Sequence, residues 1–130
     1  MKELMKMAEK AYENSYSPYS GIRIGAAVIG GSGRIYTGAN IENSSYGATI
    51  CAERSAISKA ISEGETELTA IAVTGDIDDY AYPCGICRQV MLEFMKPEAE
   101  IAVSGHDRDI KIYKLKELLP SAFKFNLGGK

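Results

Sequence analysis

The stretch Leu68-Thr69-Ala70-Ile71-Ala72-Val73-Thr74 is a nearly continuous apolar run of strand length. A run of this kind is typical of a strand that is buried on both faces, in the middle of a sheet. Two stretches with helical periodicity flank it, residues 51–63 before it and residues 84–95 after it. A buried strand between two helices predicts an α/β fold.

Both flanking helices have an apolar face and clear end signals. In residues 51–63 small and branched apolar side chains fall on one face, and Gly64 follows as a C-terminal stop. Pro83 comes directly before the helix predicted for residues 84–95. The apolar side chains of its buried face lie near its C-terminal end, and Pro97 ends it. The two helices therefore have defined N-terminal ends, at Cys51 and Cys84.

The remaining elements are read from the same periodicities. They are a first helix over residues 4–12, a hairpin of strands 22–28 and 34–40, two short strands near 101–104 and 110–113, and a last helical turn over 115–119. The order α-β-β-α-β-α-β-β-α predicts a mixed five-stranded sheet with helices on both faces, a three-layer α/β/α architecture. We find no repeat, linker or low-complexity stretch, so we expect one domain over residues 1–130.

Composition and charge exclude several function classes. The 130 residues are 45% hydrophobic and 25% charged, and the 15 basic and 17 acidic residues give a net charge of −2 without blocks of like charge. Nucleic-acid binding calls for a basic face or stripe, which is missing here. No apolar run approaches the roughly 18 residues of a membrane span, and the N-terminus lacks the apolar core of a signal peptide. We expect a cytoplasmic protein that binds neither nucleic acid nor membranes.

The three cysteines are the strongest chemical signal. Cys51 stands at the start of one predicted helix, and Cys84 and Cys87 stand in the first turn of the other. In a reducing compartment an odd number of cysteines points to metal ligands or catalytic thiols more than to disulfides. A helix N-terminus lowers a thiol pKa and so favours the thiolate that Zn²⁺ binds.

The number of ligands predicts an open metal site. Structural zinc sites are usually closed by four protein ligands, whereas catalytic sites leave a position for water. The chain has no fourth cysteine, and its one histidine, His106, falls in a predicted surface turn. Glu53, two residues after Cys51, can face a metal-bound water and transfer its protons.

Other interpretations of these motifs stay open when each is taken alone. Cys84-Gly85-Ile86-Cys87 can be half of a structural zinc site or a dithiol redox pair. Asn40 and Glu42 can be loop-capping residues, and Arg54 can be a surface charge on a helix. The glycines at 30, 31 and 33 precede neither a Lys-Ser/Thr pair nor a helix, so they indicate a hairpin turn and not a phosphate loop.

Taken together, the motifs resemble a known family. A Cys-x-Glu motif followed by Pro-Cys-x-x-Cys, with a Glu that does not bind the metal, is the signature of nucleobase deaminases. From the first helix through Phe123 the chain resembles the small homotetrameric cytidine deaminases. The matching stretches are Pro18-Tyr19-Ser20, Gly25-Ala26-Ala27, Asn40-Ile41-Glu42-Asn43, Cys51-Ala52-Glu53-Arg54, Pro83-Cys84-Gly85-Ile86-Cys87-Arg88-Gln89-Val90-Met91 and Leu118-Leu119-Pro120-Ser121-Ala122-Phe123.

The resemblance implies a fold, a reaction and a set of site residues. It implies one Zn²⁺ per subunit on Cys51, Cys84 and Cys87, with Glu53 as the catalytic proton carrier. It implies that Asn40 and Glu42 bind the ribose 3′-hydroxyl, that the Ala52 N–H binds the pyrimidine carbonyl, and that Arg54 donates to the thiolates. It also implies that Tyr46 and Phe123 reach the pocket of a neighbouring subunit in a homotetramer.

The expected activity is hydrolytic deamination of cytidine and deoxycytidine to uridine and deoxyuridine in pyrimidine salvage. One position departs from the family, because Ile22 stands where a phenylalanine commonly packs against the base. A deaminase of a modified or blasticidin-like antibiotic cytosine nucleoside is therefore an alternative. A zinc-stabilised binding module and a deaminase that edits RNA or DNA are further alternatives, and the acidic net charge disfavours the last.

Overall fold

A computed structural model of the chain describes residues 1–125. Within them the five strands form one sheet in the order β2-β1-β3-β4-β5. The elements are α1 (Lys2–Tyr12), β1 (Ile24–Gly30), β2 (Ile35–Ala39), the 3₁₀ turn η1 (Tyr46–Ala48), α2 (Ala52–Ser62), β3 (Leu68–Gly75), α3 (Gly85–Phe94), β4 (Glu100–Val103), β5 (Lys111–Lys114) and α4 (Leu115–Leu118).

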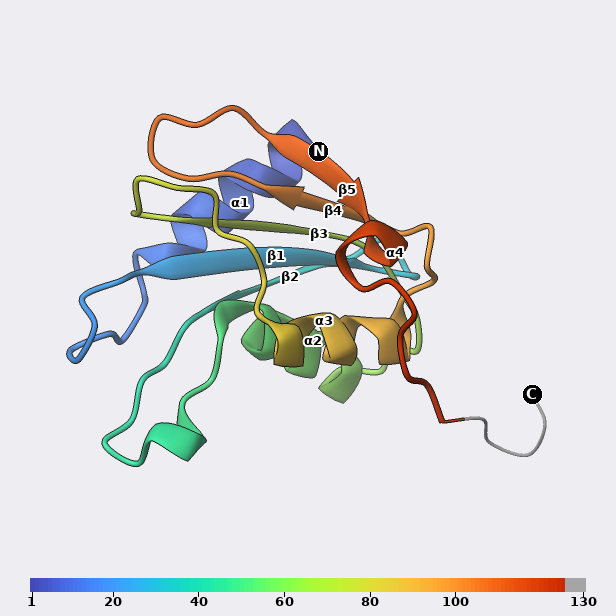
Figure 1. Cartoon of the computed structure of the whole chain (residues 1–130), viewed down its shortest axis with the longest axis horizontal. Coiled ribbons are helices and arrows are strands. Elements are labelled where there is room, and N and C mark those ends of the chain that lie inside the picture. Colours follow the sequence, from blue (N-terminus) through green and yellow to red (C-terminus); the bar gives the residue numbers. More distant parts are fainter. Residues whose placement is uncertain (126–130) are drawn as a thin grey trace.

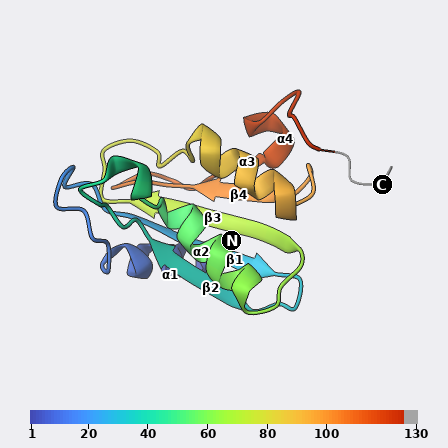
Figure 2. The same ribbon diagram turned by 90° about the horizontal axis from the view of Figure 1, so that it is seen from below.

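The sheet is mixed, as the sequence predicts. β1 pairs antiparallel with both β2 and β3, β3 pairs parallel with β4, and β4 pairs antiparallel with β5. Figure 1 shows α1 on one face of the sheet and α2 and α3 on the other, and Figure 2 shows the same layers from below. The predicted three-layer α/β/α architecture is confirmed.

Small and large side chains separate onto the two faces of the sheet. Alternate residues of a strand point to opposite faces. Alanines of the three central strands face α1, among them Ala27, Ala72 and Ala102. Branched residues one position away, such as Val28, Val73 and Val103, belong to the larger core with α2 and α3. The run over residues 68–74 thus forms the central strand, buried on both faces.

Most element boundaries differ from the sequence prediction by one or two residues. The helices expected to start at Cys51 and Cys84 start one residue later, because both cysteines adopt extended N-cap conformations with ψ of 156° and 169°. β1 starts at Ile24 and not at residue 22. The 3₁₀ turn Tyr46–Ala48 was not predicted, since its apolar content has no helical or strand period.

Candidate active site

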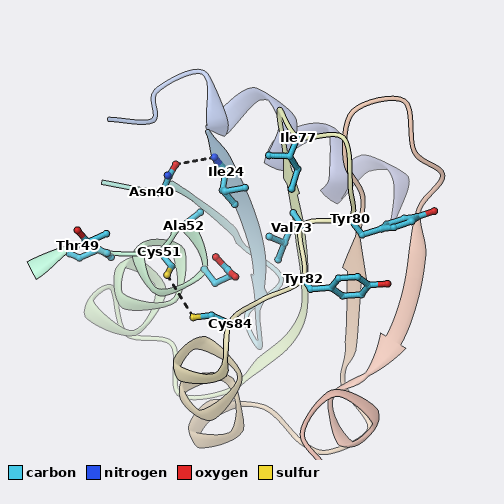
Figure 3. Close-up of a pocket in the computed structure, with 13 residues that line it drawn as sticks. Ile24, Asn40, Thr49, Cys51, Ala52, Val73, Ile77, Tyr80, Tyr82 and Cys84 are labelled. Carbon is cyan, nitrogen blue, oxygen red and sulfur yellow. Dashed lines mark hydrogen bonds between the residues drawn. The ribbon is translucent and has the colours of Figure 1, made fainter. Parts of the chain in front are cut away.

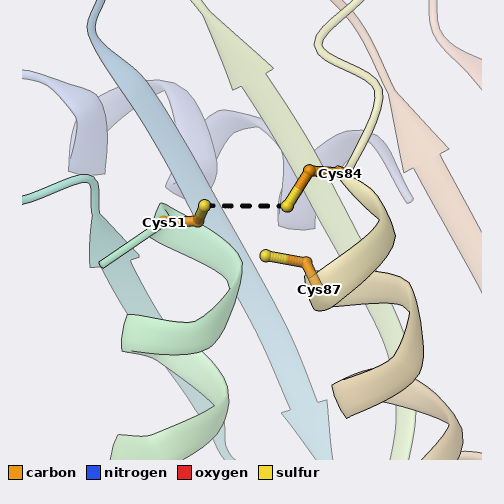
Figure 4. A group of neighbouring side chains, drawn as sticks. All are labelled: Cys51, Cys84 and Cys87. Carbon is orange, nitrogen blue, oxygen red and sulfur yellow. Dashed lines mark hydrogen bonds between the residues drawn. The ribbon is translucent and has the colours of Figure 1, made fainter. Parts of the chain in front are cut away.

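The three cysteine sulfurs come together as the sequence predicts. All three Sγ atoms lie within 4.8 Å of one another, and the Cys51 and Cys84 sulfurs are 3.9 Å apart (Figure 4). Zinc–sulfur bonds of about 2.3 Å in a tetrahedron place two sulfurs about 3.8 Å apart. The donor atoms therefore fit one Zn²⁺ ion with little movement.

The helix ends account for this arrangement. Cys51 and Cys84 are the N-cap residues of α2 and α3, and Cys87 is the third residue of α3. Figure 4 shows the two helix N-termini side by side with the thiols between them. The partial positive charge of each N-terminus stabilises a thiolate there.

Arg54 lies beside the sulfurs, on the next position of α2 after Glu53. Its Nη2 donates to the Cys51 Sγ at 3.4 Å and to the Thr49 carbonyl at 3.5 Å. Hydrogen bonding with Cys87, together with that from Arg54, lowers the pKa of the Cys51 thiol to about 5. In turn, the hydrogen bond to Cys51 raises the pKa of Arg54 above its ordinary value.

Glu53 is a buried carboxylic acid next to the sulfur cluster. Only 3% of the residue is exposed, and burial raises the pKa of its carboxyl to about 7. Among the described residues, the group able to hold a metal consists of the three cysteines and excludes both Glu53 and the exposed His106. Glu53 thus lies beside the three cysteines but outside the group that could hold a metal ion.

Cys51, Cys84 and Glu53 line a cavity of about 250 Å³, shown in Figure 3. That volume is close to the lower end of the range for small-molecule sites, about 300–1,000 Å³. Its lining residues are Ile24, Asn40, Thr49, Ile50, Cys51, Ala52, Glu53, Val73, Ile77, Tyr80, Ala81, Tyr82 and Cys84. Most of the wall is apolar, so the few polar groups fix how a ligand can lie.

Asn40 lines this cavity from the loop after β2. Its side-chain oxygen accepts from the Ile24 N–H at 2.9 Å and from the Ser15 hydroxyl at 2.5 Å, and its Nδ2 donates to the Ile22 carbonyl at 2.8 Å. Asn40 therefore tethers the loop before β1, which is the capping role that the sequence left open. One N–H of its amide has no partner among these contacts.

Glu42 lies in a neighbouring pocket with Tyr19, Ser20, Asn43, Tyr46 and Thr49, and Thr49 lines both pockets. Its Oε1 accepts the backbone N–H groups of Tyr19 and Ser20, and its Oε2 accepts the Ser20 hydroxyl. Hydrogen bonding from Ser20 lowers the pKa of Glu42. Glu42 is therefore an ionised acceptor that also holds the loop between α1 and β1.

Besides Glu42, three of the predicted binding residues lie outside the cavity that Cys51 and Cys84 line. Tyr46 is 78% exposed and packs edge-on against Tyr19, with ring centroids 6.3 Å apart. Phe123 is 73% exposed, and its carbonyl accepts a hydrogen bond from the Gln89 side chain at 2.8 Å. Ile22 is 45% exposed and does not line the cavity, whereas Ile24 does. Their predicted roles at the base remain predictions.

Sequence reasoning missed much of the apolar wall. Tyr80 and Tyr82 line the cavity from the segment between β3 and α3, and Tyr82 shares a hydrogen bond with Tyr113 of β5, with the hydroxyls 3.1 Å apart. Figure 3 shows both rings directed away from the sulfurs, toward β5. A signal was available, because segments that follow a central parallel strand commonly carry site residues.

In the part of the chain that the structure describes, no helix has the length and apolarity needed to cross a membrane.

Residues 1–103 match the protein family described as the cytidine and deoxycytidylate deaminase zinc-binding region. The cytidine deaminase of Halalkalibacterium halodurans is 46% identical over 120 residues, which cover 92% of this chain and 91% of that protein. The cytidine deaminase of Sporosarcina psychrophila is 42% identical over 123 residues, which cover 95% of this chain and 90% of that protein.

Solved structures agree with the sequence relatives. The cytidine deaminase of Burkholderia pseudomallei superposes with a TM-score of 0.89 at 40% identity, covering 94% of this chain and 98% of that one. The cytidine deaminase of Mycobacterium tuberculosis superposes with a TM-score of 0.84 at 38% identity, covering 95% of this chain and 97% of that one.

Proposed function

Because the chain belongs to the family of zinc-binding cytidine and deoxycytidylate deaminases, we propose that it hydrolyses cytidine and deoxycytidine to uridine and deoxyuridine, with release of ammonia. One observation carries the proposal: a carboxylic acid that is 3% exposed lies beside three thiols that could hold a metal ion, at a cavity of small-molecule size. We take residues 1–130 as a single deaminase domain that acts in the cytoplasm.

Cys51, Cys84 and Cys87 are the residues that would hold one Zn²⁺ ion per chain. The ion would supply a water of lowered pKa at its open coordination position. Three thiolates give the site a net negative charge, which makes such a water a weaker acid. Arg54 offsets part of that charge through its hydrogen bond to Cys51.

Glu53 carries the protons of the reaction. It takes one proton from the attacking water and delivers it to ring N3 as the C4–oxygen bond forms. It then takes the proton of the new C4 hydroxyl and delivers it to the exocyclic amine, so that the C4–nitrogen bond breaks, ammonia leaves and the C4 oxygen becomes the carbonyl of the product. Its place two residues after a ligand, in the first turn of α2, supports this role.

The base is held by backbone and apolar contacts. Ala52 is the first residue of α2, so its N–H is free of intrahelical hydrogen bonds and can donate to the pyrimidine carbonyl. The aliphatic side chains of Ile24, Val73 and Ile77 line the same cavity and offer faces for the ring. We also assign Ile22 to base packing, because it stands where the family commonly has a phenylalanine, although it does not line the cavity of the single chain.

Asn40 and Glu42 offer complementary contacts to one sugar hydroxyl. Asn40 has one N–H left to donate, and the Glu42 carboxylate has acceptor capacity left on Oε2. A hydroxyl can accept from the first and donate to the second. This supports the 3′-hydroxyl of a nucleoside as their ligand.

We propose a homotetramer whose pockets are shared between subunits. Phe123 and Tyr46 are large apolar side chains left exposed in the single chain, at 73% and 78%. In a shared pocket they would lie against a partner's nucleoside, with the Phe123 ring stacked on the base. Apart from the other subunits, we propose that the chain binds small pyrimidine nucleosides and neither nucleic acid nor membranes.

The experiment is a substrate panel on the zinc-loaded full chain. We expect release of ammonia from cytidine and deoxycytidine, with much slower release from a blasticidin-like nucleoside and from single-stranded DNA or RNA. A higher kcat/KM for the antibiotic would make the alternative substrate the correct one. Zinc binding without turnover of any of these would identify a binding module and overturn the proposal.

A further inference from the structure

The orientation of the Asn40 side chain is decided by its backbone partners. The Ile24 N–H can only donate, so the amide oxygen must face it (Figure 3). The Ile22 carbonyl can only accept, so the amide nitrogen must face that group. These contacts, at 2.9 and 2.8 Å, leave one lone pair on the oxygen and one N–H on the nitrogen. Without a further partner, Asn40 could both accept from and donate to a ligand.

Ser15 supplies the further partner. Its hydroxyl has one proton to donate and three neighbouring oxygens: the Asn40 side-chain oxygen at 2.5 Å, the Ser17 hydroxyl at 3.1 Å and the Asn40 carbonyl at 3.3 Å. The shortest contact is the one to the Asn40 side chain. Ser15 is half-buried just after α1, and the Tyr16 N–H also bonds to the Asn40 carbonyl at 3.0 Å. This backbone contact keeps Ser15 beside Asn40.

We propose that Ser15 is a positioning residue for the sugar subsite, which makes Asn40 a donor only by occupying the second lone pair of its amide oxygen. This inference rests on the proposed function, because the ligand of Asn40 is taken to be the nucleoside 3′-hydroxyl. The hydroxyl must then accept from Asn40 and send its own proton to Glu42. Only a ligand group that both accepts a hydrogen bond and donates one satisfies Asn40 and Glu42 together.

Removing the Ser15 hydroxyl would change the subsite without removing either ligand-binding side chain. The Asn40 oxygen would gain a free lone pair, and the substrate hydroxyl could then donate to Asn40 instead of Glu42. Hydrogen bonds within a network also strengthen one another, so the remaining Asn40 N–H would become a weaker donor. Both effects reduce the binding free energy that the substrate gains from its 3′-hydroxyl.

The test compares cytidine with 3′-deoxycytidine as substrates for the zinc-loaded full chain. Ser15→Ala should lower the preference for cytidine over 3′-deoxycytidine about 3- to 10-fold, mainly through the KM for cytidine, as expected for one hydrogen bond. Ser15→Thr keeps the hydroxyl and should restore the preference. Ser17→Ala is the matched control, because it removes the neighbouring hydroxyl without touching the Asn40 side chain, and should change the preference less than about 2-fold.

Each other outcome overturns the inference. An unchanged preference in Ser15→Ala would show that the hydroxyl does not act through Asn40. An equal loss of kcat/KM for both nucleosides, together with a lowered melting temperature, would assign Ser15 a structural role only. If the unmutated protein deaminates neither nucleoside, the proposed function fails as well, which separates that failure from failure of the inference alone.

Discussion

Gly38 of β2 lies so close to α2 that a Cβ atom on it would be 2.5 Å from the backbone nitrogen of Ala56. The same Cβ would be 2.9 Å from the Ala52 carbonyl oxygen. Backbone atoms cannot move aside as a flexible side chain can. This contact therefore sets the distance between the sheet and the helix that carries Cys51 and Glu53.

Gly38→Ala should lower stability and loosen the metal site together. We expect a loss of about 1–3 kcal/mol in the free energy of unfolding, typical of overpacking, and faster loss of zinc to a chelator. Urea unfolding and metal analysis measure the two effects. Gly47→Ala is the control, since a Cβ there meets no heavy atom within 4 Å. Equal stability of the two variants would mean that α2 can shift freely.

Glu53→Gln separates proton transfer from metal binding. The amide keeps the size of the side chain but cannot carry the proton, and the three thiols remain. We expect zinc content near that of the unmutated protein and a kcat lowered at least about 100-fold, as for other general acid–base groups. Glu63→Gln, an exposed carboxylate at the end of the same helix, is the control. Turnover above a tenth of the original in Glu53→Gln would contradict the assigned role.

Arg54→Gln tests the charge beside the thiolates. Loss of the Nη2 contact to the Cys51 sulfur, 3.4 Å long, leaves the negative charge of the ligands less compensated. Partners of metal ligands usually contribute about 10- to 100-fold to metal affinity or activity. We expect a reduction of that size in zinc affinity or in kcat/KM. Lys59→Gln, an exposed basic residue of α2, should change neither quantity.

The sequence predicts those parts of the site that depend on local spacing. Cys51 and Glu53 share one helical turn, as do Cys84 and Cys87, so their proximity follows from helix geometry once the helices are placed. The strand over residues 68–74 was identified for a similar reason, because a short apolar run has few other structures available. These features required no knowledge of how distant segments meet.

The remaining parts depend on packing between distant segments. Ser15 meets Asn40 only because the loop after α1 lies beside the end of β2, a contact across 25 residues. Tyr82 meets Tyr113 across 31 residues. Neither pair has a spacing that a periodicity could reveal. That the Asn40 amide keeps one N–H for a ligand likewise appears only when its partners are known.

Glu65 should make stability depend on acid pH. It is 8% exposed and accepts from Ser32 and from the Tyr36 hydroxyl, and the Ser32 hydrogen bond lowers its pKa below the ordinary value of 4.5. A lowered native pKa adds stability above the unfolded pKa, and that stability is lost as pH falls through the native pKa. Glu65→Gln should therefore be less stable at pH 7, and the difference should shrink below about pH 4.5.

Urea unfolding at several pH values between 3 and 7 measures this difference. Glu67→Gln is the matched control, because Glu67 is a half-exposed carboxylate two residues away whose only ion pair in the described residues, to Lys96, is 3.8 Å long. A constant difference between Glu65→Gln and the unmutated protein across this pH range would show that the carboxylate charge does not contribute.

Phe123→Ala tests whether a partner subunit completes the pocket. A side chain that is 73% exposed contributes little to the stability of its own chain, so loss of its ring should leave single-chain contacts intact. If the ring stacks on a partner's nucleoside, we expect KM for cytidine to rise about 5- to 10-fold, the range for an aromatic stacking contact. Phe125→Ala removes a ring of similar exposure, 71%, two residues further on. Sedimentation of both variants reports assembly, and equal KM values with an unchanged tetramer content would leave Phe123 outside the shared pocket.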